Sequence, residues 1–153
     1  MTPVPSLSAP PTLAGLPTLD TAETSASVRE GEGVLRKKGR RALYRFYATD
    51  SSSTPWDLLN AIAGVQLTRV EKLLDAADTY VSGARMKVDR GALRDHVVGR
   101  VRFTCAPMAG DAGRGAVCMW GRHGPRVGEV IGVGVDGDAV LTAAVEASHS
   151  IAH

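Results

Sequence analysis

The alternation of apolar and polar residues predicts a group of short strands in the second half of the chain. Polar and apolar residues alternate over 100–105, which is typical of a strand with one buried face. A glycine-rich loop over 110–115 follows, and 116–120 returns as the partner strand. Residues 127–133 make a third strand, and 85–88 a short strand ahead of the others. The pattern therefore predicts a three-strand antiparallel meander with one additional strand.

A stripe of apolar residues with helical spacing follows an aromatic strand predicted over 42–47. Thr54-Pro55 has the residue types of an N-cap and a first helical position. Apolar residues then recur every three or four positions, at Leu59, Ala63, Leu67, Val70, Leu74 and Ala77. The pattern predicts a helix to about Tyr80. Gly64 and the capping box that begins at Thr68 leave open a break and a second helix.

A final helix is predicted near the end of the chain, with Asp136 or Asp138 as its cap. Its apolar positions are Ala139, Val140, Ala143, Ala144 and Ala147. The resulting order is strand, helix, strand, meander, helix. This order predicts an α+β fold, with an antiparallel sheet and two or three helices packed on one face.

Residues 1–33 differ in composition from the rest and are rich in Pro, Thr, Ser and Ala, without sustained periodicity. They are expected to form a flexible extended arm ahead of a single domain over 34–153. The alternative is an arm that docks partly on the domain, because apolar residues are spread along it. These residues are Val4, Leu7, Leu13, Leu16 and Leu19.

The composition indicates a modest core and no membrane segment. Of the 153 residues, 44% are hydrophobic but only 5% aromatic, so the core must consist mainly of Val, Leu, Ile and Ala. The net charge of +2 is too small by itself to indicate a nucleic-acid or membrane partner. No apolar stretch approaches the roughly 20 residues of a membrane helix. The N-terminus lacks the basic and apolar regions of a signal peptide, so the chain as given is expected to be soluble and without an export signal.

Cys105 and Cys118 lie on the two strands of a predicted hairpin, which can bring their Cα atoms within bridging distance. A disulfide is therefore predicted, and two buried free thiols are the alternative. Such a bond normally forms outside the cytosol. Neither cysteine lies in a Cys-x-x-Cys motif, so catalytic redox chemistry is not expected.

Several short motifs resemble functional sites but lack the necessary context. Gly132–Gly137 matches the dinucleotide-binding glycine pattern, but the strand and acidic residue required further on are missing. Gly110–Gly115 lacks the Lys-Ser/Thr ending of a phosphate loop. His149 and His153 have the spacing of one helix face without further ligands, and His96 and His123 are isolated. No enzyme, cofactor or metal site is predicted.

One cluster of basic residues and two tryptophans remain. Arg36, Lys37, Lys38, Arg40 and Arg41 form the basic stretch. It is a candidate site for an anionic polymer, nucleic acid or lipid, or simply a solvated flank. Nucleic acid is not the favoured partner, because no aromatic residues are interleaved for stacking. Trp120 is expected to pack against the disulfide in the core, and Trp56 to pack on the sheet from a helical first turn.

The segment Cys118-Met119-Trp120-Gly121-Arg122-His123, followed by Val127-Gly128, resembles a pattern in uncharacterised actinobacterial (Streptomyces-type) membrane-anchored proteins. Their extracytoplasmic domains carry Cys-x-Trp-x-Asp-His, with a partner Cys about a dozen residues earlier. Val88–Leu93 resembles their Val-Asp-Pro-Gly-Pro-Leu stretch, and Pro11–Gly15 a segment that follows their membrane helix. Arg122 stands where the family has Asp.

The resemblance implies a non-enzymatic extracytoplasmic interaction or sensing module of a membrane-associated protein, here without its anchor. Its expected partner is a component of the cell envelope, either a protein or an anionic polymer. The alternative function is a small polyanion-binding protein that uses residues 36–41, located in the cytoplasm if the chain is complete.

Overall fold

The computed structural model describes residues 11–19, 22, 25–26, 29–30, 33, 42–47, 56–62, 74, 85–110, 113–121 and 126–151. At 42–44, 56–62, 126–127 and 150–151 it describes the backbone alone. The elements are β1 (Thr12–Leu13), β2 (Leu16–Pro17), β3 (Ala42–Tyr47), β4 (Trp56–Ile62), β5 (Met86–Val88), the 3₁₀ helix η2 (Arg90–Ala92), β6 (Arg94–Val98), β7 (Val101–Gly110), β8 (Gly113–Trp120), β9 (Arg126–Val133) and α3 (Gly137–Ile151).

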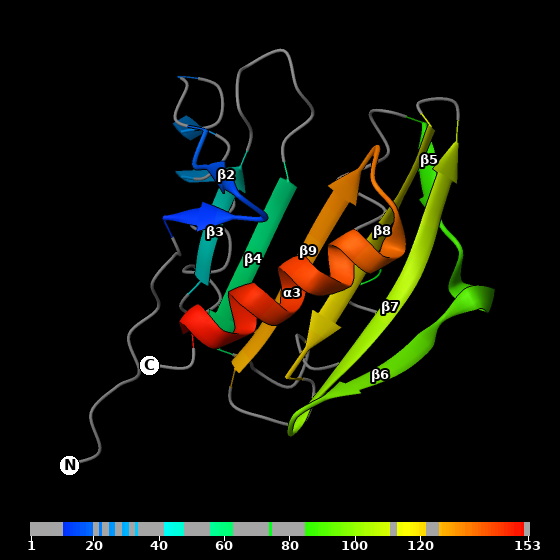
Figure 1. Ribbon diagram of the computed structural model, residues 1–153. Coiled ribbons are helices and arrows are strands. Elements are labelled where there is room, and N and C mark those ends of the chain that lie inside the picture. Colours follow the sequence, from blue (N-terminus) through cyan, green and yellow to red (C-terminus); the bar gives the residue numbers. More distant parts are fainter. Residues whose placement is uncertain are drawn as a thin grey trace.

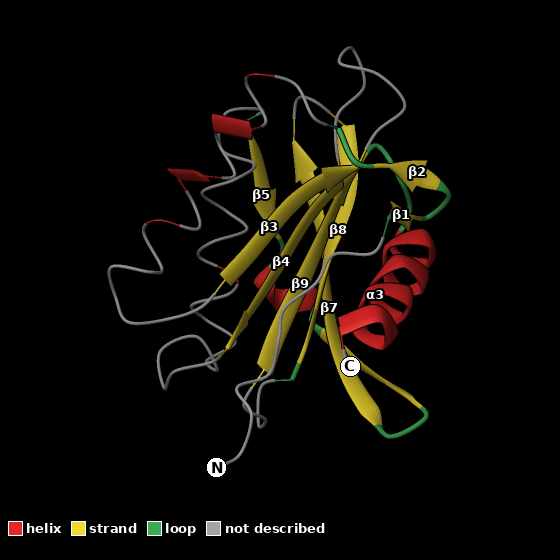
Figure 2. Cartoon of the chain, turned by 90° about the vertical axis from the view of Figure 1, so that its left-hand side faces the viewer, coloured by secondary structure: helices red, strands yellow, loops and turns green. Residues whose placement is uncertain are grey.

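A seven-stranded antiparallel sheet forms most of the described structure. Its strand order is β3-β4-β9-β8-β7-β5, and β6 also pairs with β7. The sheet curls around α3, which lies across its concave face (Figure 1, Figure 2). The predicted meander is confirmed as β7, β8 and β9, and the predicted short strand as β5.

The central strands are buried on both faces, which differs from a half-buried meander. Every residue of β8 from Gly115 to Trp120 is buried. Side chains alternate between the faces of a strand. Ala116, Cys118 and Trp120 belong to the α3 face, in one cluster with Phe103, Val130 and the apolar side of α3. The opposite face holds Thr104, Ala106, Met108, Val117, Met119, Glu129 and Ile131, all buried.

Small residues allow α3 to approach the sheet closely. Val140, Ala143, Ala144 and Ala147 are fully buried and follow the helical spacing that the sequence predicts. Asp136 is the cap, because its Oδ1 accepts a hydrogen bond from the Ala139 amide at 2.8 Å. Of the two candidate caps, Asp136 is therefore the one used.

The predicted helix that begins at Thr54-Pro55 is wrong over Trp56–Ile62. This segment is β4, and it pairs with β3 on one side and β9 on the other. Pairing on both sides satisfies its backbone hydrogen bonds, which outweighs an apolar spacing compatible with a helix. In the described part of the chain α3 is the only helix on the sheet, where two or three were predicted. The rest of the predicted helix lies outside the described residues except Leu74, which is helical and buried.

One edge of the sheet is a single strand interrupted at η2. Both β5 and β6 pair with β7, at 108–110 and 101–105 respectively. Between them, the amide of Asp89 donates a hydrogen bond of 2.9 Å to the Pro107 carbonyl. The alternation of residues in the sequence gave no prediction for β6, which forms a hairpin with β7 through Gly99 and Arg100.

Residues 11–19 of the arm pack on the domain. Leu13 is fully buried in the core beside α3, and the Ala14 amide lies 3.1 Å from Glu146 Oε2. The Leu19 amide donates to the Phe46 carbonyl at 2.7 Å, and Thr18 bridges to Tyr47. This segment therefore adds one isolated bridge beside β3 and contributes Leu13 to the core.

Candidate functional site

A disulfide joins Cys105 and Cys118 across the central strands β7 and β8. The two residues lie directly opposite each other, and their Cα atoms are 4.1 Å apart. This short separation is typical of a non-hydrogen-bonded pair in an antiparallel sheet. Cys118 is fully buried and Cys105 half-buried. The predicted disulfide is confirmed, and the alternative of two free thiols is wrong.

Aromatic residues pack beside the disulfide under α3. Trp120 is 7% exposed, and its ring centroid lies 6.1 Å from that of Phe103, with the planes inclined by 52°. Phe103 is opposite Trp120 in the β7–β8 register, two residues along from the cysteine pair. The position of Trp120 in the core of this sheet is as the sequence predicts. These residues form a structural centre, since they are buried in one apolar cluster with Val130, Leu13 and the apolar side of α3.

The Tyr47 side chain brings a titratable group into this core. It is fully buried, and burial raises the pKa of Tyr47 to about 12. Arg45 on the same strand lowers the pKa and Glu146 of α3 raises it, both less strongly than burial. The hydroxyl therefore stays neutral through the physiological range.

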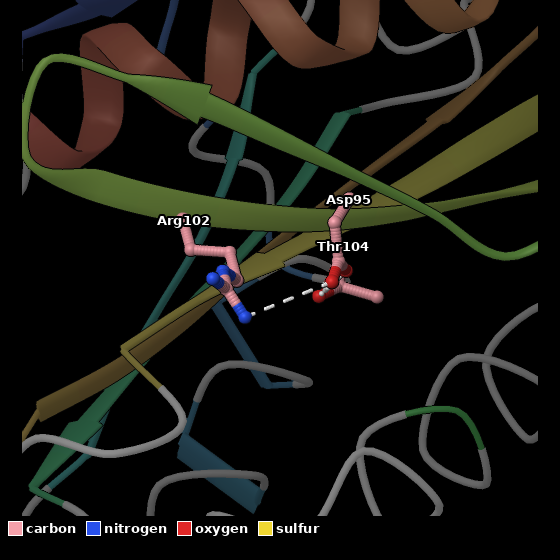
Figure 3. A network of polar contacts seen from close by, with 3 residues as sticks. All are labelled: Asp95, Arg102 and Thr104. Carbon is pink, nitrogen blue, oxygen red and sulfur yellow. Dashed lines mark hydrogen bonds and ion pairs between the residues drawn. The ribbon is translucent and has the colours of Figure 1, made fainter.

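A small polar network lies on the β6–β7 hairpin, on the face opposite α3 (Figure 3). Thr104 Oγ1 donates a hydrogen bond of 2.8 Å to Asp95 Oδ1. Arg102 Nη1 lies 4.0 Å from Asp95 Oδ2, with both side chains about half-exposed. An exposed pair of this kind contributes little to stability. The network fixes the orientation of Asp95 and leaves Arg102 accessible at the surface.

The exposed large apolar side chains of the described residues lie on β6, the edge strand of this hairpin, or directly before it. Their exposed fractions are 36% at Leu93, 66% at Val97 and 39% at Val98. A single exposed apolar residue is common on a protein surface, but three within six positions of an edge strand are a candidate contact surface. The sequence pattern alone did not predict this surface. The available signal was Val97-Val98-Gly99-Arg100-Val101, two apolar segments joined at a glycine.

The structure places an acidic residue, Glu129, in the interior, which the sequence analysis also missed. Glu129 lies on β9 opposite Met119 and is 3% exposed.

An open pocket of about 530 Å³ lies at the edge formed by β5 and η2. It is lined by Lys87, Val88, Asp89, Arg90, Pro107, Met108 and Ala109. The Asp89 carboxylate caps η2 by accepting from the Gly91 amide. Glu129 is not among the residues that line the pocket, so the two are separate features.

Some of the other residues singled out in the sequence lie outside the described part of the chain, and others lie within it. Residues 36–41, His123 and His153 lie outside the described residues, as does the side chain of Trp56. Trp56 begins β4, so its prediction as a first-turn helical residue is wrong. In the glycine-rich stretch after β9, Gly134 has a φ of +80° and its amide donates to the Arg114 carbonyl at 2.6 Å. The stretch is a strand-to-helix turn.

Across the described ranges, no three His, Cys, Asp or Glu side chains gather where a metal ion could be held. None of the helical segments that the structure describes has the length and apolar character needed to cross a bilayer. Comparisons with family models, with curated proteins and with solved structures give no match.

Proposed function

We propose that this chain is a non-enzymatic interaction or sensing module that works outside the cytoplasm as part of a bacterial membrane-associated protein. The observation that carries the proposal is the disulfide between Cys105 and Cys118. Disulfides persist in oxidising compartments and are rare in the cytosol, where thiols are kept reduced. A bond at the centre of the sheet is therefore an indication of where the protein works.

The position of the disulfide supports a structural role. It links the two longest-paired strands of the sheet beside Phe103 and Trp120, in a cluster that is otherwise formed by Tyr47 and aliphatic residues. Cys118 is fully buried, so a reductant or a substrate thiol has little access to it. A bond between adjacent strands stabilises the sheet, and it leaves function to the surface.

The exposed edge strand β6 supports the choice of an interaction module. Val97 and Val98 offer apolar contact area on a strand that pairs with β7 on one side, and Leu93 adds to it directly before the strand. Exposed apolar side chains on a strand at the edge of a sheet are typical of contact surfaces. An interaction at this edge needs no movement of the core.

Labelling of intact cells tests the location. Cells that make the protein naturally are treated with a membrane-impermeant lysine reagent, before or after lysis, and Lys87 is a fully described, exposed target. Equal labelling of intact and lysed cells is the expected result, with a cytoplasmic protein of the same cells as the control. Labelling that requires lysis would contradict the proposal.

A further inference from the structure

We infer that the tip of the β6–β7 hairpin is a docking surface for an anionic lipid bilayer. The inference deepens the proposed function by naming the partner of the module. It is carried by the combination of exposed valines and arginines on a hairpin that projects from the body of the domain.

The hairpin projects beyond the elements that surround it. In Figure 1 and Figure 2, the turn between β6 and β7 extends past α3 and past the neighbouring strand ends, at the end of the sheet opposite the β7–β8 connection. The turn is formed by Gly99, with a φ of +63°, and Arg100. A tip that extends past the described elements beside it is well placed to meet a flat surface.

The tip presents apolar side chains to both sides. Val97 pairs with Arg102 on the face opposite α3, and Val98 pairs with Val101 on the other face. Val97 is 66% exposed, the largest exposed fraction among the described large apolar side chains. Short apolar side chains on a projecting turn can enter the boundary between headgroups and acyl chains, where water is displaced from them.

The charge of the hairpin complements an anionic surface. Residues 94–102 hold three arginines and one aspartate, so with His96 neutral their net charge is 3 − 1 = +2, equal to the net charge of the whole chain. Arg94 and Arg100 are exposed, and Arg102 is 56% exposed in its side chain. Asp95 is turned toward Thr104 by their hydrogen bond. Arginines around an apolar tip contact lipid phosphates while the valines insert.

A bilayer fits this surface better than a nucleic acid does. A nucleic acid would use the arginines but would leave Val97 and Val98 in water, and Phe103 of the hairpin is buried against Trp120, where it cannot stack on a base. The projecting shape also differs from the concave sites that bind small ligands. A lipid surface satisfies both the apolar and the basic side chains of the tip.

Vesicle flotation with the oxidised full chain tests the inference. Phosphatidylcholine vesicles with and without phosphatidylglycerol are compared at low and high salt. We expect binding to the anionic vesicles, which salt weakens. Arg100→Glu should lower the partition coefficient about tenfold, whereas Arg114→Glu, the same charge change on the β7–β8 hairpin, should change it little. The double variant Val97→Ser/Val98→Ser should lose the binding that survives high salt.

Three results would overturn the inference. The first is the absence of binding to anionic vesicles, as expected if the edge strand binds a protein instead. The second is an equal loss in Arg100→Glu and Arg114→Glu, which would indicate diffuse charge. The third is a loss confined to Lys37→Glu/Lys38→Glu, which would place binding on the basic stretch. None of these results changes the labelling of intact cells, so the proposed function is tested separately.

Discussion

The indole of Trp120 on β8 covers Gly128 on β9 so closely that a Cβ atom at Gly128 would overlap the ring. The two residues are direct partners in the β8–β9 register. A large aromatic side chain thus occupies the space above a strand glycine, on the same face as the disulfide. In a core with few aromatic residues, this pairing positions the largest side chain beneath α3.

Gly128→Ala should destabilise the fold, because the added methyl group displaces the Trp120 ring. The expected loss in free energy of unfolding is about 2 kcal/mol, typical of an overpacked core. Urea unfolding followed by tryptophan fluorescence measures it. Gly137→Ala is the matched control, since a Cβ at that position meets no atom within 4 Å. Equal stability of Gly128→Ala and the wild type would show that the ring does not occupy this position.

Asp136→Ala should remove the cap of α3. The side chain accepts a hydrogen bond from the Ala139 amide, and the loss of such a cap costs about 1 kcal/mol. Asp138 lies in the first turn without a capping bond among its described contacts, so Asp138→Ala should cost less, through the helix dipole alone. Thermal unfolding of the two variants ranks them. A larger effect of Asp138→Ala would contradict the assigned cap.

The stability of the protein should fall in alkaline solution because of Tyr47. Burial raises the pKa of Tyr47 from 10.0 to about 12, so the folded state keeps a proton that the unfolded state loses near pH 10. The folded state binds more protons in this interval, and the free energy of unfolding therefore falls between pH 10 and pH 12. Below pH 10 the ionisation of Tyr47 does not change the free energy of unfolding. Urea unfolding across this pH range should show that the free energy of unfolding decreases in the wild type and decreases less in Tyr47→Phe. Identical slopes would contradict the burial of the hydroxyl.

Removal of the disulfide should lower the free energy of unfolding substantially. Closing a loop of 13 residues is expected to contribute about 3 kcal/mol. Cys105→Ala/Cys118→Ala should therefore unfold at a markedly lower urea concentration than the wild type without reductant. Reductant should destabilise the wild type and leave the double variant unchanged, which separates the bond from side effects of the reagent. A double variant as stable as the oxidised wild type would show that the bond is dispensable.

The sequence predicts the meander and the last helix well because their signals are local. The alternation in β7, the glycines between strands and the Asp136 cap each lie within a few residues of the element they specify. The cysteine pair also follows from a local hairpin, since the spacing of Cys105 and Cys118 fixes their register once the turn is placed.

The failures concern elements whose structure depends on distant partners. Trp56–Ile62 has an apolar pattern that fits either a helix or a strand. The segment is a strand because it pairs with β9, about 70 residues later. The short β6 has a sequence with two charges and no alternation, and β7 is what stabilises it. The contact surface at Val97 and Val98 was missed for the same reason, because exposure is known only after the strand has its place at the edge.

The oxidation state of Cys105 and Cys118 in the cells that make the protein decides whether it works outside the cytoplasm. Free thiols are blocked with an alkylating reagent during lysis, and the protein is digested and examined by mass spectrometry without reduction. We expect a peptide pair joined through Cys105 and Cys118, with little alkylation at either residue. Two alkylated cysteines would contradict this expectation, because a module that works outside the cytoplasm would then lack the bond on which the proposal rests.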